Sequence, residues 1–471
     1  MDRQILDYLP QEVLIDIFTR VPIKSLLLCT LVCKSWHTFV TDPSFVIAHL
    51  NRPRTLSHNN AHDLILLRNY SEQRKEEVYS LRFDDESFRE YQKIEFPFKS
   101  AANDFYRVVG CCNGVVCITD DQFRYAHDTV LWNPSIRKSV TLPKPRISEA
   151  KFEHVMGFGF DRKTNDYKVV RIVYIESRKR LEIDVYRFSS GSWEDISRSG
   201  GLGFYSIRKK APQAYLYGAV HWFATDKRSG HHLVVSFDMG DELFRPIVVP
   251  DGVGTDLSCL VSVRPAVFLG DLALIECKIS TGQENWSVWV MREYGVAESW
   301  TENLCLEVGQ VLERMVGFRE SGELLVEMSG GKLLSYDPET EKFTELEVDS
   351  NVSILTWFHA ESYKESLVLL GRHGLLGSQV HGEKNRVERA GTRKRKARKN
   401  LLYYTDNDVH IREATLMRSS AMDMRTKVVL QDCAGVEDHV QEGRKESFRA
   451  DVFPNSCAWR RMMSPFCSYG F

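Results

Sequence analysis

Histidines and carboxylates are the residues of this 471-residue chain that could do acid–base chemistry, and none stands in a catalytic pattern. His221 lies inside an apolar run beside Trp222, which is typical of a structural histidine with both ring nitrogens hydrogen-bonded. His231 and His232 follow a Ser-Gly pair, a composition typical of a surface loop. The acidic residues include no pair whose surroundings would separate two pKa values for catalysis. The sequence therefore predicts no catalytic residue among them.

The eleven cysteines could bind a metal or act as nucleophiles. Cys111, Cys112 and Cys117 come closest to a cluster, but no CxxC pair occurs and no histidine lies at zinc-finger spacing. The chain also has no HExxH, phosphate-loop, GxSxG or kinase motif. We therefore expect reduced thiols, no metal and no cofactor.

Composition is that of an ordinary globular protein, with 43% hydrophobic and 27% charged residues. The net charge of −2 gives no strong field toward nucleic acid or membranes. The apolar run from Leu26 to Cys33 is much shorter than the ~20 residues of a membrane-spanning helix. Asp2 and Asp7 do not suit a secretory signal peptide. We expect an intracellular protein of two or more domains, in the cytoplasm and/or the nucleus.

The remaining chemistry must lie in binding surfaces, and the first is predicted near the N-terminus. Pro10 presets the backbone for a helix start, and Glu12 suits the positive end of the helix dipole. Pro22 ends this helix, and a second helical run from Ser25 to about Val40 is apolar on nearly all sides until Lys34. The first helix has apolar residues at the spacing of one helical face: Leu14, Ile17, Phe18 and Val21.

Two or three short helices cannot bury this much apolar surface among themselves, because a segment of about 50 residues is too small for a core of its own. Part of the surface must therefore face another domain or another chain. A helical hairpin packed against the rest of this protein would meet that need as well as a partner would.

The order of residues from Leu9 to Trp36 is Leu-Pro-x-Glu, a helix, Pro, a Leu pair and Val-Cys-Lys-x-Trp, with Asp42-Pro43-x-Phe45 beyond it. This order closely resembles the F-box, the module that docks on the Skp-type adaptor of cullin-based ubiquitin ligases. The resemblance covers about forty residues, from Leu9 through Ala48. It implies that the matching hydrophobic positions meet the adaptor. These are Leu9, Pro10, Leu14, Ile17, Leu26, Val32, Cys33 and Trp36.

Between about residues 61 and 371 the helical period gives way to short β-like runs in a recurring order. A leucine or aromatic marker in an apolar run returns every 47 to 54 residues. A second apolar run, such as 218–222, precedes five of the markers, and a polar turn with an aromatic follows, as at 189–193. The six markers are Leu81, Trp132, Tyr186, Phe237, Trp289 and Tyr336.

A unit of about 50 residues with three or four strands has the size of one kelch-type propeller blade. Since a single blade cannot bury both of its faces, blades stack around an axis. The markers predict a β-propeller of about six blades, with Ser366–Leu370 closing the ring against the first blade. Two open sandwiches would also satisfy the strand count, but they explain the regular period less naturally.

Several sequence blocks in this region also resemble the F-box-associated interaction domain of a large plant family of F-box proteins, often labelled kelch-repeat. The match runs from about Arg107 to Leu370. The double glycine of true kelch repeats is mostly missing, because Gly200-Gly201 and Gly330-Gly331 have no regular place in the units. The matching blocks are LWNPSIRKSVTLP, GFGFDRKTNDYKVVRIV, YGAVHW, VWVMREYGVAESW and LSYDPETEKF.

The C-terminal part has a different composition. Residues 372–471 hold 19 basic and 12 acidic residues. A block this basic repels itself and stays solvated, so we expect a disordered basic tail. It could serve as a nuclear import address or simply as a linker, and nucleic-acid binding is not expected because no aromatic is interleaved in it. The basic block consists of Arg393, Lys394, Arg395, Lys396, Arg398 and Lys399, interrupted by Ala397.

The sequence thus predicts three parts: a helical F-box domain at 1–50, a kelch-like β-propeller at 51–371 and the basic tail at 372–471. The resemblances imply a non-catalytic substrate-recognition subunit of an SCF-type (Skp–cullin–F-box) ubiquitin ligase. Its expected partners are a Skp-type adaptor, cullin through that adaptor, and an unidentified target protein, with no membrane. Two alternatives stay open: an F-box protein acting outside a ligase as a binding or sequestering factor, and a propeller enzyme with an accessory helical hairpin.

Overall fold

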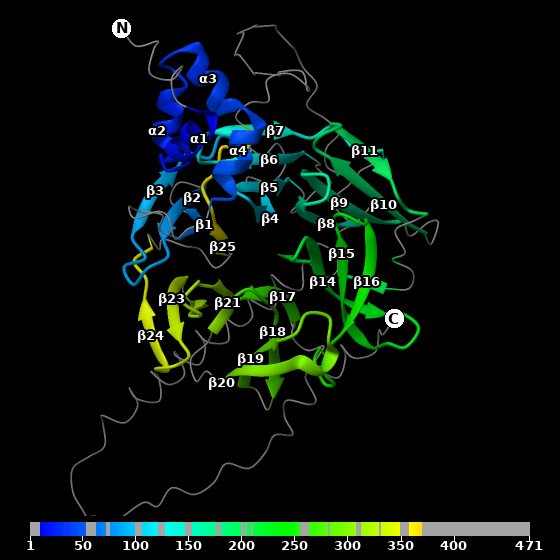
Figure 1. The fold of residues 1–471 in the computed structure, drawn as a ribbon. Coiled ribbons are helices and arrows are strands. Elements are labelled where there is room, and N and C mark those ends of the chain that lie inside the picture. The colour runs from blue at the N-terminus through cyan, green and yellow to red at the C-terminus, as the bar shows by residue number, and fades with distance from the viewer. Residues whose placement is uncertain are drawn as a thin grey trace, which may run out of the picture. The chain divides into compact units, whose positions relative to one another are not determined.

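The computed structural model describes residues 10–369 except for short segments, and all of its helices and strands belong to one compact unit, Met1–Glu383 (Figure 1). Leu9, the first predicted adaptor contact, and the predicted basic tail therefore lie outside the described residues. The segments left out are 53–62, 72–75, 99–105, 121–127, 147–152, 176–179, 199–201, 203–204, 209–210, 255–262, 281–282, 308–311, 329–330 and 349–357.

Four short helices form the N-terminal domain: α1 (Gln11–Thr19), α2 (Ile23–Cys29), α3 (Lys34–Thr41) and α4 (Pro43–Leu50). The helix predicted from Ser25 to Val40 is interrupted, because Cys33 has an extended backbone and separates α2 from α3. Asp42 ends α3 and caps α4 by accepting a hydrogen bond from the Ser44 amide at 2.8 Å. Phe18 joins the helices, with its ring 5.2 Å from those of Trp36 and Phe39.

The rest of the described chain folds into six antiparallel sheets arranged in a ring, which we number as blades 1 to 6 (Figure 1). Blade 1 holds β25 (His359–Tyr363), β1 (Leu64–Ser71), β2 (Glu76–Phe83) and β3 (Glu90–Ile94). Blade 2 holds β4 (Arg107–Cys112), β5 (Val115–Thr119), β6 (Thr129–Asn133) and β7 (Lys138–Thr141). Blade 3 holds β8 (Glu153–Asp161), β9 (Asp166–Ile175), β10 (Arg180–Arg187) and β11 (Ser192–Asp195).

Blades 4 to 6 repeat the same order. Blade 4 holds β12 (Tyr205–Ile207), β13 (Ala214–Leu216), β14 (Ala219–Asp226), β15 (His232–Asp238) and β16 (Leu243–Val248). Blade 5 holds β17 (Val263–Phe268), β18 (Asp271–Ser280), β19 (Gln283–Met291) and β20 (Trp300–Glu307), with the 3-10 turn η3 (Ala297–Ser299) before β20. Blade 6 holds β21 (Leu312–Phe318), β22 (Leu324–Met328), β23 (Lys332–Asp337) and β24 (Lys342–Glu345).

The predicted six-bladed propeller is confirmed, and the structure explains its period. All six markers lie on the third strand of a blade. Since side chains alternate between the faces of a strand, each blade contributes to two clusters, one with each neighbour. On β6, Trp132 packs toward blade 1 whereas Leu131 packs toward blade 3. A bulky residue is needed once per blade at these interfaces, which sets the spacing of the markers.

The strand that closes the ring lies earlier in the chain than predicted. β25 pairs with β1, from Leu64 opposite Tyr363 to Arg68 opposite His359, so the closing strand precedes Ser366. The prediction that Ser366–Leu370 forms that strand is therefore wrong. Residues 366–369 instead pack beside blade 2, where Ser366 lies fully buried against Asn133.

Candidate functional site

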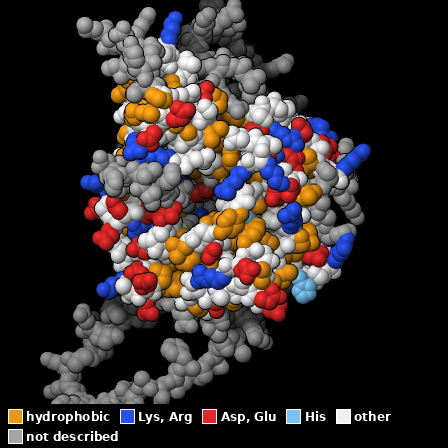
Figure 2. Space-filling view, in the orientation of Figure 1, with side chains coloured by type: hydrophobic (Ala, Val, Ile, Leu, Met, Phe, Trp, Pro, Cys, Tyr) orange, Lys and Arg blue, Asp and Glu red, His pale blue; other side chains and the backbone are white. Residues whose placement is uncertain are grey.

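The helical domain carries an exposed apolar surface on α1 and on the turn between α2 and α3. Leu31 is 81% exposed, and Leu28 and Val32 are about two-thirds exposed, at 66% and 65%. Ile17 and Val13 on α1 are also exposed. Figure 2 shows hydrophobic side chains gathered over these helices. Large exposed apolar side chains close together mark an interaction surface.

The turn between α2 and α3 is what presents Leu31 and Val32. The Thr30 hydroxyl donates to the Leu27 carbonyl at 2.6 Å and holds the end of α2. The Leu31 and Val32 amides donate to the Leu28 and Cys29 carbonyls at 3.0 and 3.1 Å, a last tight turn before the extended Cys33. The backbone polar groups are thus satisfied locally, and the two apolar side chains are left for a partner.

The predicted adaptor contacts fall into three groups. Pro10, Ile17, Val32 and Cys33 are exposed, and Leu14 and Trp36 are half-buried against the helical core. Leu26 is fully buried in that core, so its predicted contact with the adaptor is wrong for this structure. In the sequence, the run from Leu26 to Cys33 is apolar at every position but Thr30, so it has no regular polar face to show that Leu26 points inward.

Three exposed residues were missed by the sequence prediction: Val13, Leu28 and Leu31. Val13 lies one position before Leu14, outside the stripe that the helical period selects. Leu28 and Leu31 belonged to the run predicted as one continuous helix, but Leu28 lies on the exposed side of α2 and Leu31 lies in the turn that follows it. The candidate adaptor surface, as we use the term below, consists of Pro10, Val13, Ile17, Leu28, Leu31, Val32 and Cys33.

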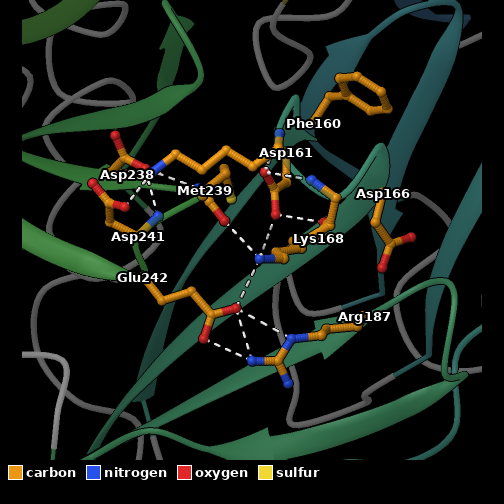
Figure 3. Close-up of polar contacts among 12 residues, drawn as sticks. Phe160, Asp161, Asp166, Lys168, Arg187, Asp238, Met239, Asp241 and Glu242 are labelled. Carbon is orange, nitrogen blue, oxygen red and sulfur yellow. Dashed lines mark hydrogen bonds and ion pairs between the residues drawn. The ribbon is translucent and has the colours of Figure 1, made fainter.

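A network of charged side chains, which we call the latch, joins blades 3 and 4 (Figure 3). The Lys168 ammonium lies 2.8 Å from both Asp161 Oδ2 and Glu242 Oε1, and it donates to the Met239 carbonyl at 2.7 Å. Glu242 also accepts three hydrogen bonds from Arg187, at 2.7, 2.8 and 3.2 Å. Such full mutual pairing is typical of a structural network rather than of acid–base groups awaiting a substrate.

Hydrogen bonds explain why the Asp161 carboxyl group stays ionised. Burial raises the pKa of this carboxyl group, but hydrogen bonds from Lys168, Thr164 and the Lys163 amide lower it by more, so the net pKa lies below its ordinary value. The carboxylate stays charged and holds the latch. A general acid would need the opposite shift.

His221 and His231 take the positions that the sequence predicted, whereas His232, predicted in a surface loop, lies in a strand. His221 is fully buried, with Nδ1 3.1 Å from the Ala214 carbonyl and Nε2 2.7 Å from the Tyr294 hydroxyl. Both ring nitrogens are therefore used in packing. His231 precedes β15 in an exposed turn, and His232 begins that strand.

The cysteines that lie closest in sequence are unreactive. Burial raises the pKa of the Cys112 thiol to about 12 and that of Cys111 well above its ordinary value. Both thiols are therefore protonated at neutral pH and are poor nucleophiles. Among the described residues, no group of three or more histidine, cysteine or acidic side chains could hold a metal ion.

Blades 4 and 5 carry a second set of exposed apolar side chains. Tyr217 and Leu269 lie at the tips of the turns between the first and second strands, where Gly218 and Gly270 follow them with positive φ. The ring of Tyr294 lies 5.3 Å from that of Tyr217. The Tyr217 hydroxyl donates to the Gly270 carbonyl at 3.1 Å, so it is already paired and the ring faces outward.

A small helical module with an exposed apolar surface, joined to a six-bladed propeller, is the architecture of an F-box protein with a propeller interaction domain. The chain belongs to the family described as F-box associated beta propeller domain, which matches residues 68–370, and an F-box-like match covers residues 6–50. None of the described helices is long and apolar enough to cross a membrane.

Relatives in Arabidopsis thaliana are named as F-box proteins. One F-box protein is 28% identical over 401 residues, covering 75% of this chain and 90% of the relative. The F-box protein CPR1 is 27% identical over 390 residues, covering 77% of this chain and 89% of the relative. An F-box/kelch-repeat protein is 27% identical over 317 residues, covering 63% and 79%.

Proposed function

We propose that the protein is the substrate-recognition subunit of an SCF-type ubiquitin ligase. In this role the F-box docks on a Skp-type adaptor that also binds cullin, and the propeller holds a target protein for ubiquitination. The observation that carries the proposal is the candidate adaptor surface, which leaves five large apolar side chains exposed on a module of four short helices.

A receptor of this kind needs no catalytic residue of its own. Holding a target close to activated ubiquitin raises the effective concentration of the target lysine. The hydrogen-bonded Lys168 and the buried His221 are consistent with a receptor that only holds its target, because neither leaves a reactive group open to a substrate. The exposed Tyr217, Leu269 and Tyr294 are candidates for contact with the target.

The test is co-purification with a Skp-type adaptor and cullin. We expect Leu31→Asp/Val32→Asp to abolish capture of the adaptor, since it puts two charges where apolar side chains would be buried. Burying a leucine or valine contributes about 1.5–3 kcal/mol, and loss of about 3 kcal/mol weakens binding more than 100-fold. The matched control is Val248→Asp, a similarly exposed apolar position on β16 of the propeller.

Each result has a definite meaning. Capture of adaptor and cullin by the wild type and by the Val248 variant, but not by the double variant, supports the ligase role. Capture of the adaptor without cullin would instead indicate an F-box protein that binds or sequesters outside a ligase. A folded wild type that captures no adaptor would exclude the proposal.

The role of the basic block at 393–399 stays a prediction, because these residues lie outside the described part of the chain. If the block acts as a nuclear import address, replacing its six basic residues by alanine should move a fluorescent fusion from the nucleus to the cytoplasm. An unchanged distribution would leave the linker interpretation.

A further inference from the structure

A short segment near the end of the described chain lies between the F-box and the propeller. After β25 the chain continues as Lys364–Leu369, which we call the clasp segment. Its last three residues are buried in the same hydrophobic cluster as Phe18 and Phe45 of the F-box and Leu131 of blade 2. The clasp segment therefore completes a core that the two domains share.

Asn133 fastens the clasp segment to the propeller. The amide nitrogen of its side chain lies 2.9 Å from the carbonyl oxygens of Ser366 and Val368 and 3.2 Å from the Ser366 hydroxyl. Asn133 and Ser366 are both fully buried. Its side-chain oxygen accepts from the Ser135 amide at 3.0 Å, which forms the turn after β6. One side chain thus shapes its own turn and holds the segment.

The turn between β4 and β5 is shaped for the same close approach. Gly114 has φ of +75°, and a Cβ atom there would lie 2.3 Å from the Lys364 carbonyl oxygen. The Gly114 carbonyl accepts from the Tyr363 hydroxyl at 3.2 Å. Since any side chain at this position would push the clasp segment away, the glycine keeps it seated.

The F-box side of the clasp segment is held by charges. The Lys364 ammonium donates to the Leu50 carbonyl at the C-terminal end of α4, where a cation also suits the helix dipole. Glu365 accepts a hydrogen bond from Tyr91 of β3 and faces Lys24 of α2. The Lys24 ammonium in turn lies 4.4 Å from the centre of the Tyr91 ring. Lys364 thus contacts α4 of the F-box, and Glu365 interacts electrostatically with Lys24 of α2.

Other blades show that a turn at the position of Asn133 does not need its amide donor. At the end of the third strand, blades 4 and 6 have Asp238 and Asp337. Their carboxylates accept from the turn amides of Gly240 at 2.8 Å and Glu339 at 2.9 Å. A carboxylate therefore suffices for the turn, and the donor of Asn133 has the clasp segment as its partner.

We infer that Asn133 and the clasp segment fix the orientation of the F-box on the propeller, so that Asn133 is a positioning residue. The F-box is held as one body with blade 2 rather than being tethered only through the chain that follows α4. If the proposed ligase function holds, this junction sets where the propeller presents its target relative to the adaptor. The mechanical part of the inference does not depend on that function.

The test variant is Asn133→Asp in the full chain. It keeps an acceptor for the Ser135 amide but removes the donor and places a carboxylate against the Ser366 and Val368 carbonyls. The readout is the distribution of distances between spin labels on His37→Cys of α3 and Leu243→Cys of β16, both exposed positions. Exposed Cys33 and Cys305 and the cysteines beyond residue 369 are replaced by serine in this background.

We expect one narrow distance distribution for the parent protein and a broad or shifted one for Asn133→Asp, measured at a temperature where the propeller of the variant is still folded. Lys364→Met is the second variant, because it releases the Leu50 contact without touching the Asn133 turn, and it should broaden the distribution too. The control Asn303→Ala, an exposed residue of β20, should keep it narrow.

The outcomes separate the inference from the proposed function. A narrow, unshifted distribution in folded Asn133→Asp and Lys364→Met would overturn the inference, whatever the adaptor does. Adaptor binding is measured on Asn133→Asp and Lys364→Met in the otherwise wild-type chain, with Cys33 and His37 retained, and should equal that of the wild type because the candidate adaptor surface is then untouched. Loss of adaptor binding together with a narrow distribution would contradict the positioning role. Failure of every version to bind adaptor would overturn only the proposed function.

Discussion

His221 shows how one side chain can join two blades while staying neutral. The Ala214 carbonyl can only accept, so Nδ1 carries the proton and Nε2 accepts from the Tyr294 hydroxyl of blade 5. Burial disfavours the charged ring and lowers the pKa of His221 to about 4, from its ordinary value of 6.5. The interface between blades 4 and 5 therefore contains an acid-sensitive hydrogen bond.

This shift predicts a pH dependence of stability. In the unfolded chain His221 takes up a proton near its ordinary pKa, so protons favour unfolding. Its contribution to stability is present above pH 6.5 and is lost as the pH falls from 6.5 to about 4. The loss should be about 3 kcal/mol. Urea unfolding of His221→Gln should show a lower stability at pH 7 and a flatter profile between pH 6.5 and 4.

The exposed His37 of α3 supplies the control for this profile. His37→Gln should follow the wild-type profile, since its side chain lies outside the blade interfaces. A His221→Gln profile as steep as that of the wild type would show that other groups cause the acid sensitivity.

How far single residues could be predicted depends on whether their role is local. The turn-forming Asp238 and the buried His221 were recognised correctly, because their neighbours in sequence define their surroundings. The burial of Leu26 and the exposure of Leu31 were not, because which side chains of α2 and of the turn after it point inward depends on their packing against the other helices and the clasp segment. Local sequence does not contain that information.

At the scale of elements, the blades are held together by latches as well as by apolar packing. The latch of Lys168 joins β9 to the turn between β15 and β16, and the side chain of Asp161 is completely buried beneath it. Removing one member of a buried ion pair leaves its partner charged without compensation. The resulting loss of stability is therefore expected at the interface between blades 3 and 4.

Lys168→Met should therefore destabilise the propeller by about 3–5 kcal/mol. Urea or thermal unfolding would measure the loss. The matched control is Lys163→Met in the turn between β8 and β9, where the lysine pairs with Asp241 in an exposed position and should matter little. Equal effects of the two variants would mean that burial does not decide the strength of the latch.

Element boundaries were harder to predict than element types. The break between α2 and α3 depends on Cys33, which in sequence is simply one more apolar residue of a helical run. The closing strand His359–Tyr363 was missed because its alternation is hidden by polar residues, whereas Ser366–Leu370 looks apolar throughout. Leu367, Val368 and Leu369 of that run belong to the clasp segment and are buried in a cluster shared by the two domains.

At the scale of the whole molecule, the blade count was predictable and the closure was not. The six blades can be counted in the sequence, because each blade needs its own bulky residue at an interface and that residue recurs at a regular spacing. The closure occurs once, between strands at opposite ends of the propeller, so no period reveals it. The same holds for the contact between the F-box and the clasp segment, whose Leu50 and Lys364 are far apart in the chain.

The seam between blades 6 and 1 is where the ring should open first. Backbone pairing with β1 holds β25, the strand that follows blade 6 in the chain, in blade 1, and Arg319 of blade 6 reaches across to blade 1. Its Nε lies 2.8 Å from Asp84 Oδ1, and both side chains are almost fully buried. Arg319 also packs its guanidinium 5.8 Å from the centre of the Phe88 ring. Losing it would leave the Asp84 carboxylate buried without its cation.

Arg319→Met should therefore speed hydrogen exchange selectively in β1–β3 and β21–β25. Strands β14–β16 lie across the ring in Figure 1, in blade 4, and should keep their protection. Exchange mass spectrometry of the wild type and the variant would measure this, with Lys168→Met as the comparison that should loosen blades 3 and 4 instead. A uniform rise in exchange over all six blades would contradict a preferred seam. It would mean that the ring unfolds only as a whole once any buried pair is broken.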